Sequence, residues 1–409
     1  MAITYAAPTG PHAVGVRDGE VLDTTYPALR PEEANGRRLM VRVWYPASPS
    51  AGQHRRYCED AELPVLRWLA EATGAPQRWA DQLAGMPSHS VTGAAVAASG
   101  FPTLVFSHGA MSWVSQNAPL MEHLASHGYV VWSVAHPGEA CGVRFRDSEL
   151  VRYDDGFKDK FVGLLAEPGY SDKLTGDIAR RFEVTPEFLD DRAMGPWSQR
   201  WVDDFRAVVD ALESGSVTGP AADLVTASDT TRLGVLGMSF GAAAAASAAQ
   251  QDERVRAAVN LDGGQFLSDL LDTDIRVPLL HLASDIRGQL AAMGVPGLTT
   301  LDANEFFFEP LSTAGTRSDV HRLRIEDVTH LELADFVLIP ATERASVLPG
   351  GGKVDSQRTI DLLNAFIRGH FDAVLLGAQN GFPGKQLAEY PEVTPIDLSP
   401  VRTWSLTRA

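Results

Sequence analysis

Residues 233–241 read Leu-Gly-Val-Leu-Gly-Met-Ser-Phe-Gly and lead into an alanine-rich run at 242–249. Ser239 therefore stands at the centre of a Gly-x-Ser-x-Gly motif, between an apolar strand-like run and a small-residue helix-like run. Gly237 and Gly241 remove the side chains that would clash where a strand turns sharply into a helix. In this setting the motif is typical of a nucleophile elbow, which raises the serine hydroxyl above the carboxyl edge of a sheet. A turn that merely ends a strand is the alternative.

Strand-like and helix-like segments alternate along the chain, which favours a mostly parallel sheet covered by helices. We expect strands at 38–45, 103–106, 129–134, 233–236, 255–261, 277–282 and 321–325, and helices at 113–126, 202–212 and 359–376. Together with the elbow, this order predicts an α/β-hydrolase fold, with a mostly parallel central sheet flanked by helices.

Two stretches, 48–98 and 138–200, interrupt this rhythm. The first holds helix-like pieces at 63–73 and 76–83, and the second is charged, aromatic and broken by proline and glycine. We interpret residues 1–409 as one α/β-hydrolase domain in which these stretches are insertions, forming a helical lid over the active site. The alternative to a lid is that these segments only elaborate the surface of the protein, and this alternative is stronger for the segment 48–98.

The composition is that of a globular protein, with 44% hydrophobic and 21% charged residues among 409. A formal net charge of −17 argues against nucleic acid and anionic membranes as partners. Cys58 and Cys141 are too few for a disulfide framework, and the start Met-Ala-Ile-Thr-Tyr lacks the features of a signal peptide, so we expect a cytoplasmic location. The uncharged run 91–121 is interrupted by proline, glycine and polar residues, which indicates buried core without stable membrane insertion.

Acyl transfer at Ser239 requires hydrogen-bond donors for the charge that develops on the substrate carbonyl oxygen. Phe240, directly after the serine, offers one backbone N–H. Ala110 offers the second, in the loop Ser107-His108-Gly109-Ala110 that follows the 103–106 strand. We expect the His108 side chain to anchor this loop rather than to enter the chemistry.

The general base should follow Ser239 in the chain, which leaves His281, His321, His330 and His370. His330 is favoured because it follows the 321–325 strand in a loop at the edge where Ser239 lies, whereas the others fall in strands or in the final helix. Two residues, Asp262 and Asp285, are candidates for the acid that orients the histidine, because they end successive strands. Hydrolases of this fold more often keep their acid at the place of Asp285.

Four segments resemble the platelet-activating factor acetylhydrolase family, including its bacterial relatives. They are Phe106-Ser107-His108-Gly109, Gly237-Met238-Ser239-Phe240-Gly241, Leu261-Asp262 and His330-Leu331-Glu332-Leu333-Ala334-Asp335-Phe336, and the resemblance spans about residues 37–376. It implies Asp262 as the acid, with Asp285 as the alternative, and Phe240 and Ala110 as oxyanion donors. It also implies a calcium-independent reaction on short or modified acyl esters. The long insertions depart from the family pattern.

These residues predict a serine hydrolase of carboxylic esters that works through an acyl-enzyme on Ser239. His330 would take the serine proton and the acid would fix the histidine tautomer, so no metal or other cofactor is required. The acidic pairs at 154–155, 190–191 and 203–204 are interpreted as solvated faces rather than metal ligands.

The expected partner is a small-molecule ester with a short-chain, lipid-like or secondary-metabolite acyl group. A biosynthetic acyltransferase, cyclase or lyase with the same Ser-His-Asp site is the alternative. A non-catalytic binding protein on a hydrolase scaffold is less favoured, because pure binding does not require this set of residues. The sequence leaves the oligomeric state open.

Overall fold

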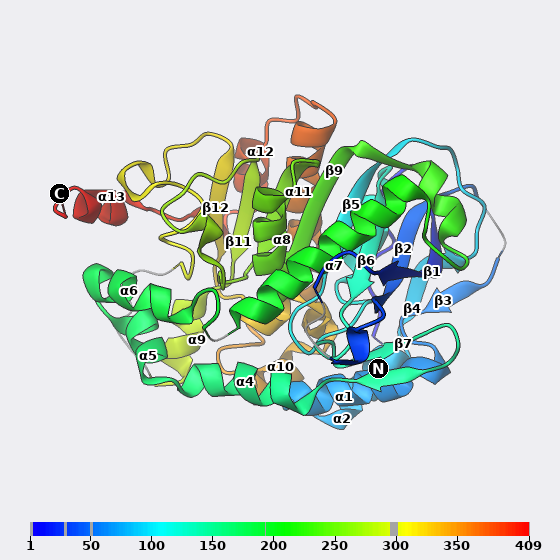
Figure 1. Ribbon diagram of the computed structural model, residues 1–409, viewed down its shortest axis with the longest axis horizontal. Helices are drawn as coiled ribbons and strands as arrows, with labels where there is room; N and C mark the ends of the chain where they lie inside the picture. The colour runs from blue at the N-terminus through cyan, green and yellow to red at the C-terminus, as the bar shows by residue number, and fades with distance from the viewer. Residues whose placement is uncertain (1–2, 28–30, 50–51, 193, 295–301, 409) are drawn as a thin grey trace.

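The computed structural model describes residues 3–27, 31–49, 52–192, 194–294 and 302–408. Within them, eleven strands form one sheet (Figure 1). In spatial order these are β13 (Val393–Pro395), β12 (Val320–Ile325), β11 (Leu279–Ala283), β10 (Val255–Leu261), β9 (Ser228–Met238), β5 (Phe101–Ser107), β6 (Val130–Ala135), β2 (Arg37–Ala47), β1 (Ala13–Asp23), β4 (Pro87–Thr92) and β3 (His54–Arg56). The block from β12 to β6 is parallel, while β13 and β2 run antiparallel to their neighbours in it. The predicted α/β-hydrolase fold is confirmed.

Alternate residues of the central strands enter separate cores on the two faces of the sheet. On β5, Val105 belongs to one core, and Leu104 and Phe106 belong to the other. Helices α7 (Gly195–Ser214) and α8 (Phe240–Gln251) cover the first face, and α3 (Ala118–Ser126) and α11 (Ser356–Leu375) cover the second. Because both faces are covered, these strands read as short continuous apolar runs.

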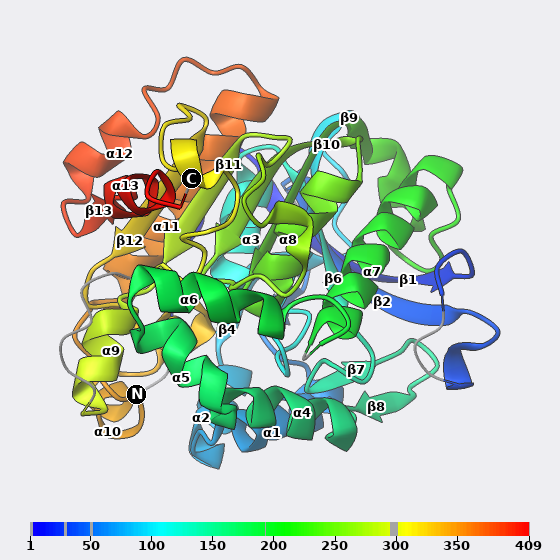
Figure 2. The same cartoon turned by 60° about the vertical axis from the view of Figure 1, so that its left-hand side comes forward.

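The remaining helices surround this three-layer core. In Figures 1 and 2, α1, α2 and α4 run along the lower rim of the molecule. The bounds are α1 (Leu63–Thr73), α2 (Gln77–Ala84), α4 (Asp155–Ala166), α5 (Pro168–Thr175), α6 (Ile178–Val184), α9 (Ile286–Ala292), α10 (Ala341–Val347), α12 (Gly384–Glu389) and α13 (Ser399–Ser405). Among the described residues, no helix is long and apolar enough to cross a membrane.

The two interrupting segments differ in what they build. The segment 48–98 forms α1 and α2, and it also adds β4 and β3 to the sheet edge, with β4 parallel to β1. The segment 138–200 forms the hairpin β7 (Gly142–Arg144) and β8 (Leu150–Arg152), then α4 to α6 and the start of α7. Residues 50–51 and 193 of these segments lie outside the described residues.

Two differences from the predicted elements have local causes. Strand β1 was missed because Gly15 and Gly19 interrupt its apolar pattern; Gly15 is needed there, since a Cβ would lie 2.3 Å from the Tyr45 ring. The helix predicted from residue 113 begins only at Ala118. The preceding Asn117 takes a left-handed backbone with φ 59°, which ends the turns at 113–117 and starts the helix.

Candidate active site

Ser239 lies in the turn between β9 and α8 with φ 56° and ψ −124°, a strained conformation for a residue with a side chain. Three glycines make room for this turn. A Cβ added at Gly237 would lie 2.3 Å from the Gly241 backbone. One added at Gly241 would lie 2.3 Å from the His108 carbonyl oxygen, and one added at Gly263 would lie 2.2 Å from the Ser239 carbonyl oxygen. The motif therefore has the geometry of a nucleophile elbow.

The structure brings Ser239, His330 and Asp262 into one hydrogen-bonded chain. His330 Nε2 lies 2.9 Å from Ser239 Oγ, and His330 Nδ1 lies 2.6 Å from Asp262 Oδ2. The three residues follow β9, β12 and β10, whose carboxyl ends meet at the same edge of the sheet. The His330 side chain is 34% exposed, so solvent reaches this chain of hydrogen bonds at the histidine.

Asp262 and Asp285, the two candidate acids, have different partners. Asp262 Oδ1 accepts a hydrogen bond of 2.9 Å from the Ser284 N–H, while Oδ2 faces His330. Burial alone would raise the pKa of Asp262, but its hydrogen bonds with His330 and Ser284 lower the pKa below its usual value. Asp285 instead caps α9, accepting from the Gly288 N–H at 3.2 Å. The geometry favours Asp262.

The loop after β5 lies directly against the serine, because a Cβ at Gly109 would be 3.1 Å from Ser239 Cβ. The carbonyl oxygen of Gly109 accepts hydrogen bonds from His108 Nδ1 at 2.7 Å and from the Ser112 N–H at 3.0 Å. Since the peptide group is planar and trans, the Ala110 N–H points the opposite way. His108 thus anchors the peptide that carries one predicted oxyanion donor.

The second predicted donor, the Phe240 N–H, belongs to the first residue of α8, where helix geometry provides no acceptor within the helix. Burial and the neighbouring His136 lower the pKa of His108 to about 3, so this anchor stays neutral near pH 7. The Gly109 N–H donates to Gln116 Oε1 at 2.8 Å. Gln116 was not identified from the sequence, where nothing marks this glutamine among the polar residues of its loop.

Aromatic side chains of the segment 138–200 reach the residue beside the serine. The ring centroids of Phe157 and Phe161, both on α4, lie 6.1 and 6.2 Å from that of Phe240. The Phe266 ring lies 5.0 Å from that of Phe240. An apolar wall therefore borders the elbow.

The interpretation of residues 203–204 as a solvated acidic pair is wrong. Asp204 is fully buried and Asp203 is 7% exposed. The helical spacing of Asp204 with Trp201, Phe205 and Val208 places it on the inner face of α7, and this spacing is the signal that could have revealed it. Among the described residues, no group of three or more His, Cys, Asp or Glu side chains is placed to hold a metal ion.

The sequence profile of platelet-activating factor acetylhydrolase, isoform II, matches residues 3–150 and 220–372. A probable 1-alkyl-2-acetylglycerophosphocholine esterase from Arthroderma benhamiae is 25% identical to this chain, over 73% of the chain and 67% of the relative. The platelet-activating factor acetylhydrolase of Cavia porcellus is 21% identical, over 64% of the chain and 55% of the relative. The chain thus spans about half to two thirds of the length of these curated relatives.

Among solved structures, a ferulic acid esterase from Streptomyces cinnamoneus superposes with a TM-score of 0.67 at 24% identity, covering 97% of this chain and 100% of that one. This likeness supports the fold. The ranges matched by the family profile make up more than half of the chain and contain the elbow, Asp262 and His330. The chain belongs to the platelet-activating factor acetylhydrolase isoform II family.

Proposed function

We propose that Ser239, His330 and Asp262 carry out the carboxylic ester hydrolysis of this family member as nucleophile, general base and acid. The observation that carries the proposal is the continuous chain of 2.9 and 2.6 Å hydrogen bonds that begins at a strained elbow serine. Asp285 is not assigned a catalytic role, because its carboxylate is engaged in capping α9.

In this proposal the hydrogen-bonding capacity of each side chain sets the direction of each proton transfer. A carboxylate accepts hydrogen bonds, so His330 Nδ1 donates to Asp262 and Nε2 is left to accept the Ser239 proton during attack. The resulting imidazolium is stabilised by Asp262, and it returns the proton to the leaving alcohol. The oxyanion would receive the N–H groups of Phe240 and Ala110. Water, activated by the same histidine, then releases the acyl group.

We propose a short acyl group on a small-molecule ester as the substrate, lipid-like or from secondary metabolism. The rings of Phe157, Phe161 and Phe266 pack against Phe240, the residue next to Ser239, and the two curated relatives are named for acetyl esters. In this proposal the segment 138–200 is a lid within a single domain. A cytoplasmic location is also proposed; the two buried free cysteines agree with it.

Labelling with a fluorophosphonate tests the nucleophile. Intact-mass analysis should show one adduct on the wild type and none on Ser239→Ala. Ser247→Ala, which removes a buried hydroxyl farther along α8, is the matched control and should label normally. An adduct that survives in Ser239→Ala would refute the assignment.

A panel of p-nitrophenyl esters from acetate to decanoate tests the substrate class. We expect kcat/KM to be highest for the shortest chains and to fall as the chain lengthens. Acyl transfer to an added alcohol or amine in preference to water would instead favour the acyltransferase alternative.

A further inference from the structure

A second serine–histidine–aspartate chain lies buried beside the oxyanion loop. Ser107 Oγ is 2.8 Å from His136 Nε2, and His136 Nδ1 is 2.7 Å from Asp204 Oδ2. All three side chains are 0% exposed, so they cannot meet a substrate. The chain connects the end of β5, the residue after β6 and the middle of α7.

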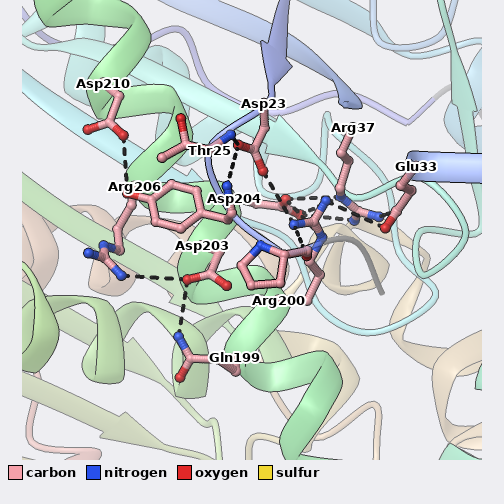
Figure 3. Close-up of polar contacts among 12 residues, drawn as sticks. Asp23, Thr25, Glu33, Arg37, Gln199, Arg200, Asp203, Asp204, Arg206 and Asp210 are labelled. Atoms are coloured by element: carbon pink, nitrogen blue, oxygen red, sulfur yellow. Dashed lines mark hydrogen bonds and ion pairs between the residues drawn. The ribbon is translucent and has the colours of Figure 1, made fainter. Parts of the chain in front are cut away.

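The partners of Asp204 give each of these hydrogen bonds one direction. Arg37 donates to the Asp204 carboxylate through Nε at 3.0 Å and Nη2 at 2.9 Å, and the Arg200 guanidinium lies beside it (Figure 3). Although burial raises the pKa of Asp204, the charges of Arg37 and Arg200 favour its ionised form, and a carboxylate can only accept, so His136 Nδ1 donates to Asp204. Burial lowers the pKa of His136 well below its usual value and keeps the imidazole neutral. His136 Nε2 therefore accepts from the Ser107 hydroxyl.

This chain is linked to both segments that supply the proposed oxyanion donors. Ser107 directly precedes His108, the residue that orients the peptide carrying the Ala110 N–H. The His136 ring stacks on Trp201 with centroids 3.8 Å apart, and Trp201 packs edge-on against Phe240 at 4.8 Å. A shift of His136 would therefore disturb both backbone donors.

We propose that Asp204, His136 and Ser107 are positioning residues that hold the oxyanion loop, and with it the Ala110 N–H, in place for the tetrahedral intermediate. The inference rests on the proposed oxyanion role of Ala110 and Phe240. Asp204 and Trp201 lie in residues 151–219, between the two ranges that the family profile matches. Ser107 and His136 lie inside the matched range 3–150, so the chain joins residues of the family pattern to residues outside it.

The test measures oxyanion stabilisation directly. Ser107→Ala is compared with the wild type on p-nitrophenyl acetate and on its thionoester, in which sulfur replaces the carbonyl oxygen. Sulfur accepts hydrogen bonds weakly, so hydrolysis of the thionoester gains little from the oxyanion donors. Each kcat is divided by the concentration of active sites, which is measured by titration with a fluorophosphonate. For Ser107→Ala we expect kcat on the oxoester to fall about tenfold or more, with KM nearly unchanged. On the thionoester, kcat should change less than about twofold.

Ser126→Ala is the matched control. It removes an equally buried hydroxyl, which donates to the His123 carbonyl oxygen at 2.7 Å at the end of α3, and it should leave the ratio of the two esters unchanged. Activity that falls equally on both esters, or a ratio that stays at the wild-type value in Ser107→Ala, would overturn the proposal.

Two substitutions of His136 provide a second test that does not depend on Ser107→Ala folding. Both lose the stacking on Trp201, but His136→Gln places an amide oxygen near the original Nε2, whereas the shorter side chain of His136→Asn cannot reach Ser107. We expect His136→Gln to retain more of the oxoester preference, and equal ratios would contradict the inference. A wild type without any oxoester preference would instead refute the proposed oxyanion function.

Discussion

The amide variant Asp262→Asn tests the acid, because the structure fixes how the new side chain would sit. In the wild type, Oδ1 accepts the Ser284 N–H at 2.9 Å and Oδ2 accepts from His330 Nδ1 at 2.6 Å. The amide oxygen must stay opposite Ser284, because an NH₂ group there would face another donor. The NH₂ group then faces His330 Nδ1, which has to accept a hydrogen bond.

This reversal of the hydrogen bond between residue 262 and His330 should lower kcat. His330 with an accepting Nδ1 carries its proton on Nε2, the atom that must take the proton of Ser239. In a serine protease, an acid-to-amide change with this effect lowers kcat by about 10⁴, equivalent to about 5 kcal/mol in the activation free energy. We expect Asp262→Asn to lose about three to four orders of magnitude in kcat.

The matched control is Asp285→Asn, one strand farther along the sheet. Asp285 caps α9 through its hydrogen bond from Gly288, and asparagine caps helices about as well as aspartate, so we expect kcat to change less than about threefold. The assay is kcat on p-nitrophenyl acetate for both variants, with circular dichroism to verify folding. A larger loss in Asp285→Asn than in Asp262→Asn would refute the reasoning.

Three further changes test other parts of the structure. Burial raises the pKa of Asp335 to about 7 despite its hydrogen bond from a tyrosine, so the stability that this carboxyl contributes is full below about pH 4 and is lost as pH rises through about 7. Asp335→Asn should therefore gain stability relative to the wild type between about pH 4 and 7, by about 4 kcal/mol in all, and a pH-independent difference in urea unfolding would contradict this. A Cβ at Gly263 would lie 2.2 Å from the carbonyl oxygen of Ser239, whereas one at Gly264 would lie 3.6 Å from its nearest neighbour. Gly263→Ala should lower both kcat and stability, by about 1–3 kcal/mol for the latter, while Gly264→Ala should change stability by less than about 0.5 kcal/mol; similar melting curves and activities for the two would refute the packing argument. Phe161→Ala should shift the ester panel toward longer acyl chains if α4 borders the acyl pocket, whereas Val162→Ala, at an exposed position one residue on, should not; identical panels for both would remove α4 from the pocket.

Short-range steric requirements made the elbow and its neighbouring strands predictable. Gly237 and Gly241 are adjacent in sequence to the turn they permit, and the apolar run of β10 has the predicted bounds of 255–261. Ser239 and His330 were found by their position relative to such strands, and the structure places them 2.9 Å apart. Between Asp262 and Asp285 the strand pattern gave no decision, because both follow a strand at the same edge.

Contacts between segments that are distant along the chain could not be predicted from the sequence. Strand β1 depends on a glycine that accommodates the ring of Tyr45 from the neighbouring strand. Helical spacing places Asp204 on the inner face of α7, but its partners lie 68 and 167 residues away, at His136 and Arg37, and this spacing does not identify them. An acidic side chain is expected in water unless a partner is known, and only the fold supplies that partner.

Burial decides which of three aspartate–histidine pairs can do chemistry. His330 with Asp262 is partly exposed, whereas His136 with Asp204 and His281 with Asp302 are buried. The third pair continues through Asn260, whose side chain binds both the N–H and the carbonyl oxygen of Gly263, beside the acid. The His136 pair bonds to Ser107 at the end of β5 and the His281 pair continues to the Gly263 backbone, so buried hydrogen bonds hold both segments next to Ser239 in place. The same residue types thus form an accessible hydrogen-bonded chain where one imidazole reaches solvent, the site proposed here for the chemistry, and a buried support where the imidazole is covered.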